Sequence, residues 1–230
     1  MQDVKEKLGR SDVQHGPFSD RVFLMKLDEA DFPGIIGQLD DLAGARQYTK
    51  IFAMVPVHTQ EAFAADGYAT EARVPGFFRG EADGYFMGKY LDESRRVEKR
   101  AELVKDVVAI AQAKKSPHAD ISLEPGFAWR TTTAEDAPQM AEVFETVFGS
   151  YPVPVFNPEY LRAQMAQGQL YFGIWEGDKL VSLASPYIDD EDLNGELTDF
   201  ATLKTFRGKG FAGFLMRKME EEMAQRGIKT

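Results

Sequence analysis

The sequence has 230 residues, of which 43% are hydrophobic and 28% charged, as expected for a soluble protein of one large domain or two small ones. It has no cysteine, which excludes disulfides, thiolate zinc sites, iron–sulfur clusters and a cysteine acyl-enzyme, and its three scattered histidines argue against a metal site. The net charge of −10 argues against nucleic acid as a partner, because phosphate binding requires a basic surface. No apolar run could span a membrane and the N-terminus is charged, so we expect a cytoplasmic protein with no membrane partner.

The first half of the chain predicts alternating strands and helices. Ile35, Ile36, Leu39 and Leu42 give one stretch the single apolar face of a helix, whereas the neighbouring apolar runs are typical of strands. The predicted elements are a strand at 21–27, a helix at about 31–46, a strand at 50–55, a short helix ending at Gly67, and strands near 69–74 and 84–91. The predicted order is therefore β-α-β-α-β-β.

Residues 92–115 have a different pattern, with apolar side chains at spacings of three and four among many charges: Val97, Ala101, Val104, Val108 and Ala111. This pattern predicts one amphipathic helix that packs on a neighbouring domain and ends at Ser116-Pro117. We therefore divide the chain into residues 1–92, a helical linker at 93–124 and a second domain at 125–230.

The second half predicts the order β-α-α-β-β-β-α. Its first helix begins with Thr133, and Asp136 is placed to complete a capping box. The predicted elements are a strand at 128–131, that helix, a helix at 158–167, strands at 170–175, 179–185 and 196–203, and a helix from about Gly208 to Arg226 with Gly227 as its C-cap.

The segment from Arg207 to Gly213 (RGKGFAG) lies where the last strand turns into the last helix. Its glycines allow close backbone approach, and free N–H groups at a helix N-terminus bind anions, so we expect a phosphate site here. The spacing also matches the dinucleotide fingerprint, which leaves an NAD-binding domain as an alternative. That fold needs an acidic residue about 20 positions further on, and the sequence ends before it.

The pattern Arg207-x-x-Gly210-x-Ala212 resembles the acetyl-CoA pyrophosphate loop of the GCN5-related N-acetyltransferase (GNAT) family. The segments 76–80, 83–90 and 196–210 are similar to those of the beta-lysine N-epsilon-acetyltransferases within that family. The resemblance implies an α/β fold with a GNAT-like mixed sheet, in which a degenerate GNAT-like half-domain precedes the acetyl-CoA-binding domain. It further implies acetyl-CoA as co-substrate, no metal, and direct transfer of the acetyl group to the side-chain amine of beta-lysine or a similar small amine.

The resemblance also implies roles for individual residues. Backbone amides of the last strand would bind the pantetheine arm and the thioester, and the loop would bind the pyrophosphate; these residues are Phe200, Ala201, Thr202 and Leu203, then Arg207, Gly208, Lys209, Gly210, Phe211 and Ala212. Glu196 lies where several family members have a general base, which is needed because an ammonium with a pKa of about 10.4 must lose a proton before it attacks. Substrate binding or a solvated strand end is the alternative for Glu196. Strand alternation places Asp199 on the opposite face, so we expect separate tasks for the two carboxylates.

Two other functions remain open from the sequence: acetyl transfer to a different amine such as lysine or a polyamine, and a non-catalytic CoA-binding or interaction module. The family's fold continues with further elements, including a tyrosine that often protonates the leaving thiolate, and these are not found before Thr230. We therefore expect a C-terminally truncated chain with little or no activity. An open sheet edge would then favour self-association, such as a homodimer.

Overall fold

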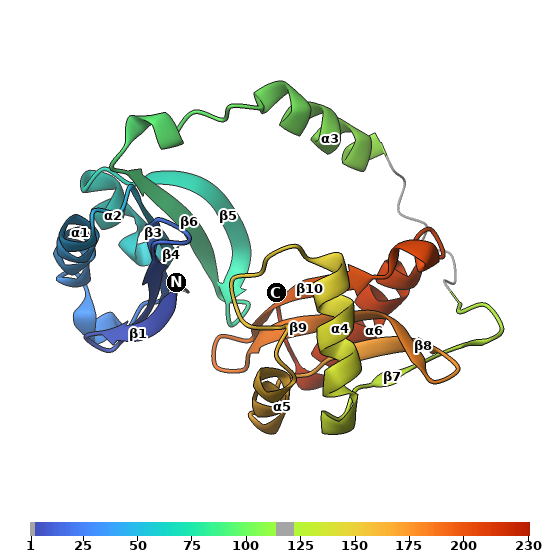
Figure 1. Ribbon diagram of the computed structural model, residues 1–230. Coiled ribbons are helices and arrows are strands. Elements are labelled where there is room, and N and C mark those ends of the chain that lie inside the picture. Colours follow the sequence, from blue (N-terminus) through green and yellow to red (C-terminus); the bar gives the residue numbers. More distant parts are fainter. Residues whose placement is uncertain (1–2, 114–121) are drawn as a thin grey trace. The chain divides into compact units, whose positions relative to one another are not determined.

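The computed structural model covers residues 1–230 and describes residues 3–113 and 122–230. The chain forms two compact units, Met1–Pro117 and His118–Thr230 (Figure 1). Within the described residues, none of the helices has the length and apolar character needed to cross a bilayer. The predicted helix end at Lys115 and the breaker Ser116-Pro117 lie outside the described residues.

The first unit is a mixed sheet in the order β1-β2-β3-β4-β6-β5. Neighbouring strands are antiparallel except β3 and β4, which are parallel and are joined through α1. The elements are β1 (Val4–Leu8), β2 (Ser11–Gly16), β3 (Arg21–Lys26), α1 (Ile35–Arg46), β4 (Lys50–Pro56), α2 (Gln60–Ala65), β5 (Ala69–Phe78), β6 (Ala82–Tyr90) and α3 (Ala101–Ala113).

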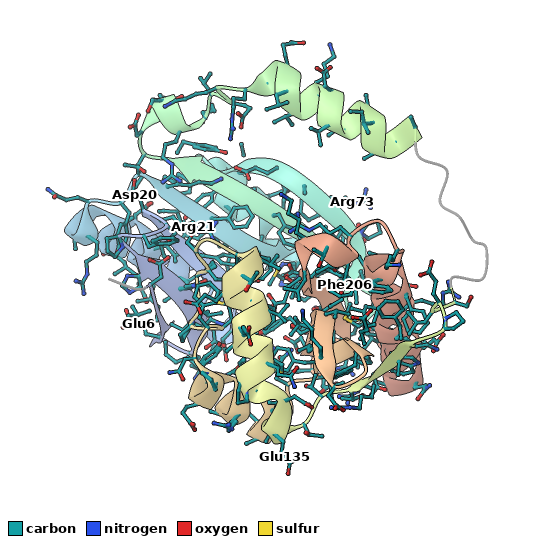
Figure 2. The ribbon with its side chains drawn as sticks, turned by 45° about the vertical axis from the view of Figure 1, so that its right-hand side comes forward. Glu6, Asp20, Arg21, Arg73, Glu135 and Phe206 are labelled. Atoms are coloured by element: carbon teal, nitrogen blue, oxygen red, sulfur yellow. The ribbon has the colours of Figure 1, made fainter. Side chains whose placement is uncertain are left out.

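The core of the first unit lies between one face of this sheet and the two helices α1 and α2. Leu24 and Ile51 from the parallel strands are fully buried against Ile35 and Leu39 of α1 and Phe63 of α2. The predicted β-α-β-α-β-β elements are therefore confirmed in type and order. The opposite face carries aromatic rings, with the Arg21 guanidinium 5.2 Å from the centre of the Phe23 ring (Figure 2).

The sequence pattern missed the hairpin of β1 and β2. β1 is an edge strand whose side chains are mostly exposed and charged, so it lacks apolar alternation. In β2 the buried positions include Ser11 and His15, which are polar. Both ring nitrogens of His15 are hydrogen-bonded, one to Tyr48 and the other to Glu6, so this polar side chain can be buried. A strand with polar residues at buried positions has no alternating hydrophobic pattern in its sequence.

The turn from β3 into α1 has no phosphate loop. Its Asp31 carboxylate accepts the backbone N–H groups of Arg10 and Ser11 and the Ser11 hydroxyl, each at 2.7 Å. The hydrogen bond from the Ser11 hydroxyl is the main cause that lowers the pKa of Asp31 below its ordinary value. The Asp31 carboxylate therefore ties the segment before α1 to the turn between β1 and β2.

The helix predicted at 92–115 is shorter, because α3 begins only at Ala101 and a 3₁₀ turn occupies Glu93–Arg95. All α3 residues are exposed, including Leu103, Val107 and Ile110. Within the described part of the first unit, no element buries this apolar stripe, and its packing on a neighbouring domain stays a prediction.

The second unit is an antiparallel sheet in the order β10-β9-β8-β7. One face is covered by α4 and α5 and the other by α6 (Figure 1). The elements follow the predicted order and are β7 (Phe127–Thr131), α4 (Ala137–Val147), α5 (Pro158–Ala166), β8 (Phe172–Glu176), β9 (Lys179–Asp189), β10 (Asn194–Thr202) and α6 (Phe211–Arg226).

Short sequence signals determine where two of these helices, α4 and α6, begin or end. Thr133 and Asp136 form the predicted capping box, in which Asp136 accepts the Thr133 backbone N–H at 2.7 Å. Gly227 ends α6 in the left-handed conformation. The five residues of α6 that were predicted to share an apolar face are all buried: Phe211, Phe214, Leu215, Met219 and Met223. These contacts fix α6 against β8, β9 and β10, so its N-terminus lies next to the end of β10.

Candidate active site

The loop before α6 contains two backbone conformations that strongly favour glycine. Gly208 and Gly210 have φ of 86° and 79°, a region that other residues rarely enter. Gly210 is also the N-cap of α6, and the first N–H groups of a helix have no acceptor within the helix. These donors and the helix dipole attract an anion, as the sequence predicts.

The loop and the end of β10 share one hollow of about 260 Å³. Its lining is Thr202 with Phe206, Arg207, Gly208, Gly210, Phe211, Ala212 and Gly213. Arg207 Nε donates to the Thr202 carbonyl at 3.1 Å and so ties the loop to β10. Phe206 lies in the turn just before the loop (Figure 2). Arg207 brings a guanidinium to this lining, and none of these lining residues carries a carboxylate.

The predicted loop cation Lys209 does not line this hollow. Its ammonium forms an ion pair with Glu124 at 2.8 Å and lies 5.4 Å from the centre of the Phe127 ring. The positive charge beside the hollow is therefore that of Arg207. Lys209 instead attaches the loop to the segment before β7.

The four residues predicted to bind the pantetheine arm, 200–203, differ in whether their backbone N–H groups are already hydrogen-bonded within the sheet. Leu203 donates its N–H to Val181 of β9 at 3.0 Å, so this amide is already used in the sheet. At the other end of β10, Gly195 donates outward to the Thr230 carbonyl at 2.8 Å. Because amide directions alternate along a regular strand, the N–H group of Thr202, next to Leu203, faces the outer edge of β10. The Ala201 side chain is buried in the core.

A β-bulge in β10 changes which side chains share a face. The register with β9 shifts between Thr198 and Ala201, and Asp199 within the bulge has a φ of 55°. The expectation that Asp199 faces away from Glu196 is therefore wrong. Asp199 accepts the Tyr151 hydroxyl, and the charges of both Asp199 and Glu196 help raise the pKa of that hydroxyl, after burial. The inserted residue cancels the alternation, so both carboxylates lie on the side of α4 and α5.

Asp199 is the centre of a group of hydroxyl side chains that we call the Asp199 cluster: Asp199, Tyr151, Tyr160, Tyr171 and Ser185. Ser185 Oγ donates to the carboxylate at 2.5 Å. Burial, followed by the Asp199 charge, raises the pKa of Tyr160 and of Tyr171. Among the described residues, no lysine, arginine or histidine forms an ion pair with Asp199.

Glu196 is exposed and lies opposite Tyr187 of β9, near the cluster but outside it. An exposed carboxylate close to bulk water can accept a proton and pass it on, which is the task predicted for Glu196. Sequence reasoning missed the other members of the site, because they come from separate elements. The one local signal for the bulge was the aspartate at position 199, because aspartate is enriched among residues with positive φ.

The chain is similar to known acetyltransferases. Residues 137–230 match the model of the Acetyltransferase (GNAT) family. The chain is 28% identical to the beta-lysine N(6)-acetyltransferase of Methanococcus maripaludis over 97% of this chain and 81% of that protein. It is also 28% identical to the enzyme of the same name from Methanosarcina mazei, over 86% and 80% of the two chains.

A solved structure contains the fold over almost the whole chain. The C-terminal DUF2156 domain of a putative lysylphosphatidylglycerol synthetase from Agrobacterium fabrum is 12% identical, with a TM-score of 0.55 over 97% of this chain and 68% of that one. The likeness establishes the fold alone. The family match over residues 137–230 and the acetyltransferase relatives show that the second unit contains an acetyl-CoA-dependent N-acetyltransferase domain of the GNAT type.

Proposed function

We propose that the native protein transfers the acetyl group of acetyl-CoA to the side-chain amine of beta-lysine. The observation that carries this proposal is the shared hollow of the glycine loop and the end of β10, with Glu196 and Asp199 further along the same strand. Two relatives with 28% identity over most of the chain bear the name of this activity and support the choice of acceptor.

Each part of the site has a role in direct transfer. Acetyl-CoA supplies the thioester whose carbonyl carbon the neutral amine attacks, so that a C–N bond forms and the C–S bond breaks. CoA leaves as its thiol, because the proton that the amine loses on forming the amide balances the proton gained by the thiolate. The loop from Arg207 to Ala212 holds the pyrophosphate, and backbone N–H groups at the end of β10, among them the outward N–H of Thr202, hold the pantetheine arm and the thioester carbonyl. Glu196 takes the proton that the ammonium must lose before attack.

The test is acetyl transfer by the native protein with a panel of amines. Beta-lysine, lysine and a polyamine are each incubated with acetyl-CoA, and free thiol and acetylated product are measured by absorbance and mass spectrometry. We expect the highest kcat/KM with beta-lysine and acetylation of its side-chain amine. A higher kcat/KM with another amine would assign a different acceptor. Binding of CoA without turnover of any amine would instead identify a non-catalytic CoA-binding module.

A further inference from the structure

The Asp199 cluster contains a partly buried carboxylate with only neutral partners. Its oxygens accept hydroxyls from Tyr151 and Ser185, and Ser185 and Tyr171 are 1% and 3% exposed. A carboxylate accepts about four hydrogen bonds, so two described hydroxyl donors leave acceptor positions open. A charge withdrawn from water without a counter-ion is costly, and a cationic ligand would remove that cost.

The cluster is rigid enough to be a binding site. The Tyr151 ring stacks on Phe148 with 4.8 Å between ring centres, and Tyr171 packs edge-on against Phe144, which is fully buried. Tyr160 comes from α5. Aromatic rings around a carboxylate attract an ammonium group through the ring faces as well as through the charge.

An ammonium that stays paired with Asp199 is not the amine that attacks the thioester. Pairing with a carboxylate favours the charged form of an amine, whereas attack requires the neutral form, and the proposed function assigns proton removal to Glu196. A residue that holds an ammonium therefore serves best when it binds an amine that stays protonated. The acceptor would then need two amines, one held at the cluster and one that reacts.

We propose that the Asp199 cluster binds the second, non-reacting ammonium group of a diamino acid, and that Asp199 thereby selects diamines over monoamines. This inference rests on the proposed function and extends it, because beta-lysine carries two amines and only one is acetylated. Asp199 is a positioning residue: it sets where the reacting amine lies without taking its proton.

The test compares beta-lysine with the matched monoamine acid that lacks the beta-amino group. We expect the native protein to have a KM about 10- to 100-fold lower for beta-lysine, the range of a hydrogen bond to a charged group. Asp199→Asn should erase this preference by raising the KM for beta-lysine, with little change in kcat or in either constant for the monoamine. Asparagine suits this position because it keeps the shape and tolerates the positive φ of residue 199.

Asp190→Asn is the matched control, since it makes the same substitution at an exposed aspartate just after β9, outside the cluster. It should keep the preference for beta-lysine. Equal losses with both acids in Asp199→Asn, or a native protein that does not distinguish them, would overturn the inference while the proposed function stands. If neither acid is acetylated, the proposed function is wrong. Calorimetry with beta-lysine then still decides the inference, because binding that Asp199→Asn does not weaken would overturn it.

Discussion

At the scale of single residues, Glu196 and Asp199 show how one inserted residue changes which side chains of a strand lie on the same face of the sheet. Strand alternation separates positions 196 and 199, but the bulge between Thr198 and Ala201 returns both side chains to one face. The two carboxylates then differ in surroundings. Glu196 is exposed, whereas Asp199 is enclosed by hydroxyl groups. This difference supports the assignment of proton transfer to Glu196 and substrate positioning to Asp199.

Replacement of the base gives the first prediction at this scale. Glu196→Gln in the native protein should lower kcat by roughly 100-fold at neutral pH, because the substrate ammonium then lacks a proton acceptor. Part of the activity should return as the pH approaches the amine pKa of about 10.4, where free amine is plentiful. A pH–rate profile of kcat measures both effects, and a profile identical to that of the unchanged protein would rule Glu196 out as the base.

Residue patterns in the sequence predicted the glycine loop but not the Asp199 cluster. The loop is contiguous, and glycines at 208 and 210 both have the positive φ that their spacing suggests. The cluster draws on a loop, α5, the residue before β8, and β9 and β10, so its members are brought together only by the sheet. Lys209 lies in the loop and was predicted to bind the phosphate, but its ammonium forms an ion pair with Glu124, a contact that the sequence does not indicate.

At the scale of elements, helix signals were more informative than strand signals. The capping box of Thr133 and Asp136 and the Gly227 C-cap are local arrangements that the sequence encodes directly. The β1–β2 hairpin has no such signal, since its strand faces carry charges and buried polar groups. The start of α1 was placed too early because Pro33 disfavours helical geometry in the residue before it, and the helix begins at Ile35.

The capping box leads to a prediction of acid sensitivity. The bidentate hydrogen bonds from Arg130, at 2.6 and 2.7 Å, are the main cause that lowers the pKa of Asp136 below its ordinary value. Because the pKa is lower in the folded state, this stabilisation is present above the unfolded-state pKa, about 3.9, and is lost as the pH falls through the folded-state pKa. Asp136→Asn should therefore destabilise the protein by about 1–2 kcal/mol at neutral pH.

The measurement is the free energy of unfolding between neutral pH and pH about 3, from denaturant titrations. The difference between Asp136→Asn and the unchanged protein should shrink as the pH falls. Glu135→Gln is the matched control, because the neighbouring Glu135 side chain is exposed and points outward (Figure 2). A difference that stays constant with pH would show that the Asp136 charge contributes nothing through its pKa.

At the scale of the whole molecule, each unit has a turn from a strand into a helix, and the two turns differ. In the first unit the Asp31 carboxylate binds the backbone of Arg10 and Ser11, whereas in the second unit the turn contains two glycines with positive φ. Only the second turn is rich in glycine. The apolar side chains of α3 are exposed within the first unit, and periodicity indicates an apolar face without indicating its partner.

The most direct test of the central claim is calorimetric titration of acetyl-CoA into the chain and into Gly210→Val. Valine cannot easily adopt the φ of 79° at position 210, so the backbone donors of the loop would be lost. Gly227→Val is the matched control, because Gly227 has a similar φ of 76° at the other end of the same helix. We predict that acetyl-CoA binds the unchanged chain and Gly227→Val, that Gly210→Val loses binding severely, and that NADH binds none of them. Unchanged acetyl-CoA affinity in Gly210→Val would contradict the account.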